Sequence, residues 1–302
     1  MTAPTHDRTD VYTRVTNRIL ADLERGVRPW MKPWDAGHAA GRIARPLRAT
    51  GQPYRGINTL MLWMTAMERG YASPFWLSYR QAQGLGGQVR RSEHGTLVVY
   101  AGTVTRREPD GDGEEGERDI HFLKGYTVFN AEQVDGLPEH FHIPAPVPLD
   151  PMQRIAAADG FFAATGADIH TGGTRAYYAI GSDHIQMPPV ESFRDAESHA
   201  ATLGHETVHW TRHPSRLARD LGRKRWGDEG YAAEELVAEI GSAFLCADLG
   251  ITPEVREDHA AYIASWLEVL RNDTRFIVSA AAHAQRAVDF LHGLQPPVRQ
   301  AA

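Results

Sequence analysis

Residues 205–209 read His-Glu-Thr-Val-His, and the two histidines and the glutamate are the side chains that a zinc hydrolase takes from one helical turn. On an α-helix, residues four apart are separated by about 40° around the axis and roughly 6 Å along it, so His205 and His209 can bind one ion. Glu206 then lies beside the ion and can take a proton from water whose pKa the metal lowers. The spacing predicts a metal-dependent hydrolase with Glu206 as its catalytic base.

The element that must carry this motif is a helix over residues 196–212. The segment has no proline and a single glycine, Gly204. Apolar residues at helical spacing can pack behind the metal-binding face. A chance match to the motif would instead place two core histidines and a surface glutamate on an ordinary helix, and the next helix argues against that alternative.

A site of this kind needs a third protein ligand, and a second helical segment over residues 231–246 offers one. Glu235 and Glu239 are four residues apart on it and share one face. We expect Glu235 to bind the metal with His205 and His209, and Glu239 to accept an imidazole N–H behind it. This two-histidine, one-glutamate arrangement resembles the gluzincin site of thermolysin-like peptidases.

His213 is the rival third ligand, because it follows His209 by four residues. On a straight helix His213 and His205 would lie about 12 Å apart along the axis, too far for two bonds of about 2 Å to one ion. His213 could serve only if the helix broke, and Pro214 helps to end the helix after it. We therefore expect a capping or ion-pair role for His213.

The bound ion is expected to be one divalent metal, Zn²⁺, with Mn²⁺ as the alternative. Hydrolysis of a peptide also needs a donor to the developing oxyanion. Three side chains qualify by residue type alone: Tyr231, His213 and His283.

Charge is distributed unevenly along the 302 residues, whose formal net charge is −6. Up to Arg107 there are sixteen Lys and Arg against seven Asp and Glu, and beyond it sixteen against 31. A basic segment attracts phosphates and an acidic one repels them, so the two parts are expected to face different partners. We expect no membrane association and a cytoplasmic protein, because the sequence has neither an apolar leader nor an apolar stretch of 18 residues.

Five prolines between residues 138 and 151 mark the expected domain boundary, because proline can continue neither a helix nor a central strand. We expect an N-terminal domain over 8–137, a stiff linker over 138–150 and a second domain over 151–296. The chain is long enough for two cores. The one cysteine, Cys246, lies in an apolar helical stretch and is expected to be a buried packing residue.

The coarse pattern predicts an α+β fold. In the first domain we expect helices over 11–25 and 59–69, and strands over 96–106 and 120–129 joined by an acidic, glycine-rich loop. In the second domain, segments 175–180 and 184–187 suit the small sheet that forms one rim of a zincin cleft.

Aromatic and basic residues are interleaved in the first third of the chain, which holds four of the seven tryptophans and five of the ten tyrosines. Stacking tolerates any base and guanidinium groups follow the backbone, so the pattern favours single-stranded DNA binding. Ordinary core aromatics under a solvated basic surface are the alternative. The residues expected to contact DNA are Trp30, Trp34, Tyr54, Arg55, Asn58, Trp76, Tyr79, Arg90, Arg91 and Lys124.

Short motifs along nearly the whole chain form a recognisable set. In the first part they are Pro29-Trp30 with Pro33-Trp34, Tyr54-Arg55-Gly56-Ile57-Asn58, Gln81-Ala82 with Leu85-Gly86-Gly87, Val89-Arg90, Phe122-Leu123-Lys124 and Tyr126-Thr127-Val128-Phe129-Asn130. In the second part they are Ala176-Tyr177-Tyr178, Asp183, Ile185, Met187-Pro188 and residues 205–219. The set resembles the ArdC family of plasmid antirestriction proteins, whose first domain is similar to that of TraC-type conjugative primases. Ser92 stands where the family pattern has a turn glycine, and the acidic loop resembles an insertion.

The resemblance implies single-stranded DNA binding by the first domain, a zincin-like metallopeptidase as the second, and protection of incoming plasmid DNA from host restriction during conjugation. The implied partners are single-stranded DNA and an unidentified protein substrate, for which the host restriction system is a candidate source. Two other classes stay open: a DNA-coating protein whose metal site is structural, and a primase-accessory or nuclease-like enzyme. One His-His-Glu site lacks the acidic cluster of two-metal phosphoryl chemistry, which disfavours the nuclease.

Overall fold

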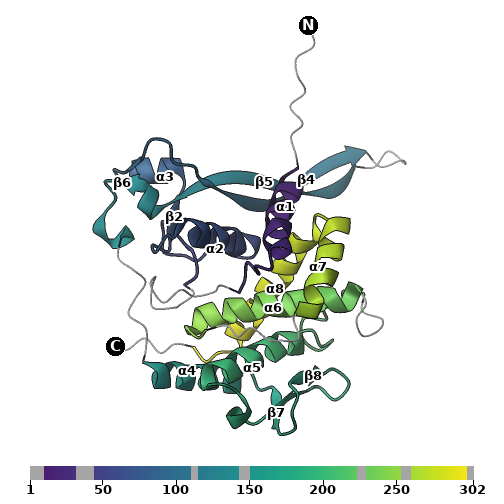
Figure 1. The fold of residues 1–302 in the computed structure, drawn as a ribbon. Helices are drawn as coiled ribbons and strands as arrows, with labels where there is room; N and C mark the ends of the chain where they lie inside the picture. The colour runs from purple at the N-terminus through teal and green to yellow at the C-terminus, as the bar shows by residue number, and fades with distance from the viewer. Residues whose placement is uncertain are drawn as a thin grey trace.

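The computed structural model describes residues 10–31, 44–109, 115–142, 150–222, 229–252 and 260–297. Figure 1 shows a long two-stranded ribbon with helices beneath it at the top, a layer of helices below, and a small sheet at the bottom. Helices and strands both occur in each half, and four of the six described strand pairs are antiparallel, which confirms the α+β class predicted from the sequence.

The N-terminal half is built around one curved sheet. Its four strands have the order β1-β2-β5-β4, and β3 pairs separately with β6. Two longer helices and one short one pack around these strands. The elements are α1 (Val11–Glu24), β1 (Leu47–Arg48), α2 (Ile57–Arg69), β2 (Phe75–Leu77), α3 (Tyr79–Gly84), β3 (Gln88–Val89), β4 (Thr96–Pro109), β5 (Glu115–Asn130) and β6 (Val134–Asp135).

The β4–β5 hairpin is longer than the sequence indicated. The two strands pair in unbroken antiparallel register from Thr96 with Val128 to Pro109 with Glu115, so they run into the acidic segment predicted as a loop. Each added pair satisfies main-chain hydrogen bonds, which explains why strands continue into residues of low strand propensity. The connection over 110–114 lies outside the described residues. The predicted helices at 11–25 and 59–69 are present as α1 and α2.

The C-terminal half contains the remaining long helices and a three-stranded sheet of order β7-β9-β8. Strand β8 pairs antiparallel with β9, which confirms the sheet expected at 175–180 and 184–187, and β7 joins β9 in parallel. The elements are α4 (Pro151–Ala164), β7 (Asp168–Thr171), β8 (Tyr177–Ala179), β9 (His184–Met187), α5 (Ala196–Trp210), α6 (Glu229–Leu249), α7 (Ala260–Asn272) and α8 (Phe276–Gly293).

One hydrophobic cluster joins the two halves. Buried residues of α1 and α2 belong to the same cluster as buried residues of α6 and α8, and the Trp63 ring packs edge-on against Phe244 at 5.7 Å. Arg45, 9% exposed, donates to both carboxylate oxygens of Asp248 at 2.9 and 3.0 Å. The division at 138–150 stays a prediction. Its start packs as a short 3-10 helix with Phe141 buried, and residues 143–149 lie outside the described part.

Cys246 is buried in α6, and burial raises the pKa of its thiol to about 12, as expected for a packing residue. Among the helices that the structure describes, none combines the length and apolar character needed to cross a membrane.

Candidate metal centre

Helices α5 and α6 bring the predicted ligands together. Helix α5 begins after Asp195, whose side chain accepts the N–H of Ser198 as an N-cap. Gly241 of α6 lies against Val208 of α5, where an added Cβ would be 2.9 Å from the Val208 methyl carbons. The missing side chain therefore lets the two helix backbones approach closely, and the ligands of both helices meet between them.

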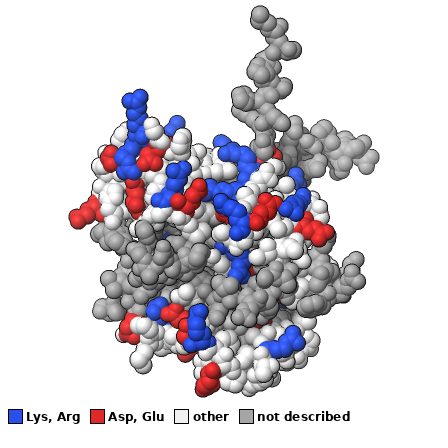
Figure 2. All heavy atoms as spheres, in the orientation of Figure 1, with Lys and Arg blue, Asp and Glu red and all other residues white. Residues whose placement is uncertain are grey.

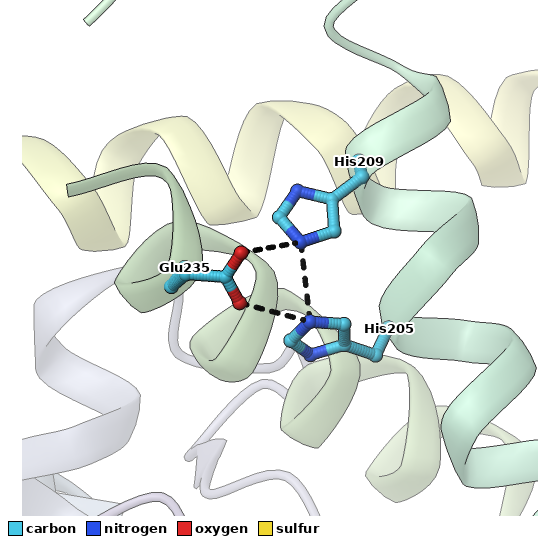
Figure 3. A group of neighbouring side chains, drawn as sticks. All are labelled: His205, His209 and Glu235. Atoms are coloured by element: carbon cyan, nitrogen blue, oxygen red, sulfur yellow. Dashed lines mark hydrogen bonds and ion pairs between the residues drawn. The ribbon is translucent and has the colours of Figure 1, made fainter. Parts of the chain in front are cut away.

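The three predicted ligands form one compact cluster (Figure 3). The His205 and His209 Nε2 atoms lie 3.1 Å apart, and the Glu235 carboxylate oxygens lie 3.4 Å and 3.5 Å from them, respectively. Ligands of a tetrahedral ion with bonds of about 2 Å are separated by about 3.3 Å. The spacing of the three donor atoms therefore fits one divalent ion. The sequence alone could not give these distances.

A separate buried carboxylate lies behind each imidazole. Glu234 Oε1 is 3.1 Å from His209 Nδ1, and Glu239 Oε1 is 3.6 Å from His205 Nδ1. A carboxylate beside Nδ1 favours the tautomer that is protonated there and leaves a lone pair on Nε2. Two such lone pairs facing each other 3.1 Å apart repel unless a cation or a proton lies between them.

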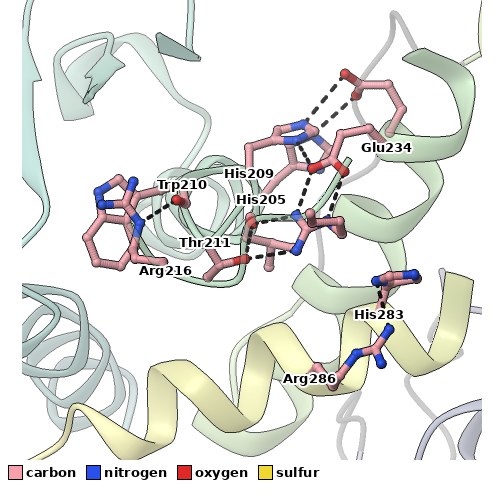
Figure 4. A network of polar contacts seen from close by, with 11 residues as sticks. His205, His209, Trp210, Thr211, Arg216, Glu234, His283 and Arg286 are labelled. Carbon is pink, nitrogen blue, oxygen red and sulfur yellow. Dashed lines mark hydrogen bonds and ion pairs between the residues drawn. The ribbon is translucent and has the colours of Figure 1, made fainter. Parts of the chain in front are cut away.

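Glu239 lies beside the His205 imidazole, which is the kind of position predicted for it. The sequence analysis did not identify the role of Glu234 or of its partner Arg219. The buried Arg219 guanidinium donates to both Glu234 oxygens at 2.8 and 2.7 Å, and to the hydroxyl of Thr211 and the carbonyl of Val208 at 3.0 Å. Figure 4 shows Glu234, Thr211 and His209 in this network. The arrangement fixes one glutamate, and through it His209. The adjacent glutamates Glu234 and Glu235 could have indicated this role for Glu234. Successive helical residues point in different directions, so only one of the two can bind the ion from the same face.

The electrostatics of the site favour a cation. Burial raises the pKa of Glu234, but hydrogen bonds from Arg219 and His209 outweigh it and lower this pKa to about 2. The neighbouring histidines likewise lower the pKa of Glu235. Burial lowers the pKa of His209, but Glu235 and Glu234 raise it to about 10 in the absence of metal. A proton thus occupies the charge position that a divalent ion would take.

The other residues of the predicted site lie around this cluster. Glu206 is buried on α5, 3% exposed, in the same turn as the histidines. His213 lies outside the ligand cluster, in the turn after α5, where its Nδ1 is 2.7 Å from the Ser215 hydroxyl and accepts the Ser215 N–H at 3.2 Å. Tyr231 is buried at the start of α6, and His283 lies on α8 beside Arg286 (Figure 4).

His283 predicts an acid-sensitive contribution to stability. Burial lowers its pKa, the positive charges of Arg286 and Arg219 add to this, and the value falls to about 4 despite Glu234. Between about pH 6.5 and 4, His283 is protonated in the unfolded chain but stays neutral in the folded chain. The free energy of unfolding therefore decreases as pH falls. We expect His283→Gln to flatten this decrease in urea unfolding series, and the exposed His94→Gln to leave it unchanged. Equal pH slopes for wild type and His283→Gln would disprove this assignment.

The structure corrects part of the predicted DNA-contact set. Trp30 and Trp76 are 0% and 1% exposed, and Tyr54 is 8% exposed with its hydroxyl donating to the Trp76 carbonyl at 3.3 Å. Their rings are covered by protein and cannot stack on bases, so the core alternative holds for all three. Asn58 is also structural, because its side-chain amide exchanges two hydrogen bonds with the Val99 main chain. Trp34 lies outside the described residues.

The remaining predicted contacts are on the surface. Arg55 pairs with Asp289, and Arg90 pairs with Glu93 at 2.8 Å. Arg91, Tyr79 and Lys124 are exposed. Ser92, in place of the family's turn glycine, has a positive φ of 69°. Figure 2 shows Lys and Arg grouped over the upper part of this view, where α1, α3, β4 and β5 lie in Figure 1, with acidic side chains between them.

An exposed aromatic surface that sequence reasoning missed lies on the β4–β5 hairpin. Tyr100, Phe122, Lys124 and Tyr126 point to one side, because Tyr100 pairs with Lys124, Gly102 with Phe122, and alternate residues share a face. We call these four residues the hairpin face. Tyr100 and Tyr126 are 57% and 44% exposed, and the Lys124 Nζ lies 5.3 Å from the Tyr126 ring centroid. The alternation of aromatic and basic residues along β5 could have indicated this surface from the sequence.

The helix pair, its His-His-Glu cluster and the small sheet define a zincin-like metallopeptidase domain, joined here to a sheet-containing N-terminal half. Residues 156–283 match the zincin-like metallopeptidase family, and residues 9–129 match the N-terminal domain of anti-restriction factor ArdC. The metal-free crystal structure of antirestriction protein ArdC from plasmid R388 is similar with a TM-score of 0.80 and 48% identity, over 95% of this chain and 98% of that one. The chain therefore belongs to the ArdC antirestriction family.

Further relatives agree with this assignment. The Mn(II)-bound structure of R388 ArdC is similar with a TM-score of 0.79 and 46% identity, over 96% of this chain and all of that one. The uncharacterized protein y4eC of Sinorhizobium fredii (strain NBRC 101917 / NGR234) is 44% identical over 95% of this chain and 93% of its own length. The DNA primase TraC of Escherichia coli is 39% identical over 93% of this chain, which spans only 27% of that longer protein.

Proposed function

We propose that this chain protects plasmid DNA from restriction by binding single-stranded DNA through its N-terminal half and hydrolysing a protein at the His205–His209–Glu235 site. The observation that carries the hydrolase part is the tetrahedral spacing of three donor atoms with a buried carboxylate behind each imidazole. We propose Zn²⁺ as the ion, since two imidazoles and one carboxylate form a common catalytic zinc site, with Mn²⁺ as the alternative that a relative is known to bind.

A bound divalent ion would polarise the scissile carbonyl and make water acidic enough to attack it. Glu206 would accept the proton of the attacking water and return it to the leaving amine. In the described part of the chain, strand β8 is an edge strand of the sheet of order β7-β9-β8 and packs against α5. An extended peptide adding to that edge would lie beside the helix that carries His205 and His209, so we propose that the edge orients the substrate.

Single-stranded DNA binding is proposed to use the hairpin face in place of the buried tryptophans. The Tyr100 and Phe122 rings are 6.2 Å apart and both lie over Gly102, where an added Cβ would be 2.5 Å from Phe122. The two rings therefore lie side by side on the surface, and Lys124 supplies charge near Tyr126. Adjacent exposed aromatic rings suit base stacking without sequence preference.

We expect Tyr100→Ala and Tyr126→Ala each to weaken single-stranded DNA binding by about 1–3 kcal/mol, the usual range for losing one stacked base. Fluorescence anisotropy with an unstructured labelled oligonucleotide measures the change. Tyr177→Ala is the matched control, because Tyr177 is 44% exposed on β8 in the other half. Wild-type affinity in both hairpin variants would remove the hairpin face from the proposal.

The whole function is tested by conjugation of a plasmid carrying this gene into restricting and non-restricting recipients. We expect wild type to protect, and both Glu206→Gln and the double variant Tyr100→Ala/Tyr126→Ala to lose protection while transfer into the non-restricting recipient is unchanged. Full protection by Glu206→Gln would exclude hydrolysis and leave DNA coating with a structural metal site. Loss of transfer into both recipients would favour the primase-accessory alternative.

A further inference from the structure

The segment that follows α1 reaches from the N-terminal half into the wall of the metal site. Trp30 is fully buried, and its indole N–H donates to the Glu239 Oε2 atom at 3.1 Å. The Arg28 guanidinium lies 3.8 Å from the same oxygen, and the Trp30 ring packs edge-on against Trp266 of α7 at 5.6 Å. One hydrogen-bond donor and one positive charge from the N-terminal half thus converge on one carboxylate of the C-terminal half.

The other oxygen of that carboxylate faces a metal ligand. Glu239 Oε1 lies 3.6 Å from His205 Nδ1, and His205 Nε2 belongs to the ligand cluster. Contacts therefore run from Trp30 through Glu239 to His205. We propose that Trp30 is a positioning residue for the metal site, so that the N-terminal half completes a site whose ligands all come from the C-terminal half. The inference deepens the proposed function, since it rests on metal binding at His205, His209 and Glu235.

The physical reason lies in the freedom of a glutamate side chain. Glu239 is 5% exposed, so water does not hold its carboxylate in place. With Oε2 accepting from Trp30, the carboxylate group is oriented and Oε1 is directed at the His205 ring. A carboxylate beside Nδ1 sets the tautomer and angle of the imidazole and raises its basicity as a ligand. Without the indole donor, Glu239 loses the hydrogen bond on Oε2, and Oε1 is held less firmly against the His205 ring.

Trp30→Phe in the full-length protein tests this, because phenylalanine keeps an aromatic ring in the core and removes the N–H donor together with part of the indole volume. Zinc affinity is measured by competition with a chromophoric chelator. We expect it to weaken roughly 3- to 10-fold, below the 10- to 100-fold typical of losing the carboxylate that contacts a ligand histidine. The visible spectrum of the Co²⁺-substituted protein should shift as well, since it reports ligand geometry.

Trp63→Phe is the matched control. Trp63 is also a buried tryptophan of the N-terminal half, its indole N–H donates to the Ala44 carbonyl at 2.9 Å, and it packs on α6 through Phe244. Its indole N–H bonds to the Ala44 carbonyl and not to Glu239, so we expect a comparable loss of thermal stability with unchanged zinc affinity and Co²⁺ spectrum.

A double-variant comparison separates positioning from packing. In a Glu239→Ala background the indole has no carboxylate to hold, so Trp30→Phe should change zinc affinity no further. The proposal is overturned if Trp30→Phe leaves zinc affinity unchanged, if Trp63→Phe weakens it equally, or if Trp30→Phe has the same effect with and without Glu239. A wild-type protein that binds no divalent metal would instead overturn the proposed function itself.

Discussion

Glu235→Ala should lose stoichiometric zinc, with an affinity weaker than wild type by roughly 100-fold or more, since it removes a direct ligand. The remaining His205 and His209 Nε2 atoms, 3.1 Å apart, would offer an ion only two protein donors. Metal content after dialysis and chelator competition measure the loss. Because the ion binds only the folded site, the melting temperature of wild type should also rise with added zinc, and that of Glu235→Ala should not.

His213→Ala is the control for this experiment. His213 is the next histidine along the chain, but it caps a turn through Ser215 outside the ligand cluster. We expect wild-type zinc content in this variant. The ligand assignment is wrong if His213→Ala loses metal while Glu235→Ala retains it.

Glu206→Gln should lower peptide hydrolysis by about 10²- to 10⁴-fold, the contribution of a general base, while zinc content stays at the wild-type level. The amide keeps the shape of the buried side chain but cannot take the proton of the attacking water. Turnover of a mixture of fluorogenic peptides, with and without single-stranded DNA, measures the loss. Glu268→Gln, at an exposed position of α7, controls for the loss of one charge.

Unchanged turnover in Glu206→Gln would show that any hydrolysis arises elsewhere or from a contaminant. No turnover in wild type under any of these conditions, combined with full zinc occupancy, would favour a structural ion. These outcomes separate the two roles of the site, because the zinc measurement and the turnover measurement respond to different residues.

Local sequence patterns predicted most of the helices and strands that position the site. The helix carrying residues 205–209 and the one carrying Glu235 were predicted because helical periodicity depends only on nearby residues. The small sheet of β8 and β9 and the β4–β5 hairpin followed from strand-forming runs separated by turn residues. Two histidines at i, i+4 share a helix face whatever surrounds them, so the sequence determined which side chains could meet.

The tertiary structure decided which side chains are covered, and this reversed the prediction for Trp30, Trp76 and Tyr54. An aromatic residue in a basic segment has the same sequence pattern whether it faces solvent or the core, since burial depends on elements far along the chain. Trp30 contacts Glu239, 209 residues away. Tyr100 is exposed although its chain neighbour Val99 is buried, because successive side chains of a strand point to opposite faces of the sheet.

The sequence by itself determined which groups are available for chemistry: a His-His-Glu donor set, a glutamate in the same helical turn and an asymmetric charge. Only the tertiary structure decided how that chemistry is held. It placed Arg219 on Glu234 and Trp30 on Glu239, so each histidine of the cluster has its own hydrogen-bonded carboxylate beside it. Helical spacing is a local property of the backbone, whereas hydrogen bonds between distant residues exist only after the core that joins the two halves has formed.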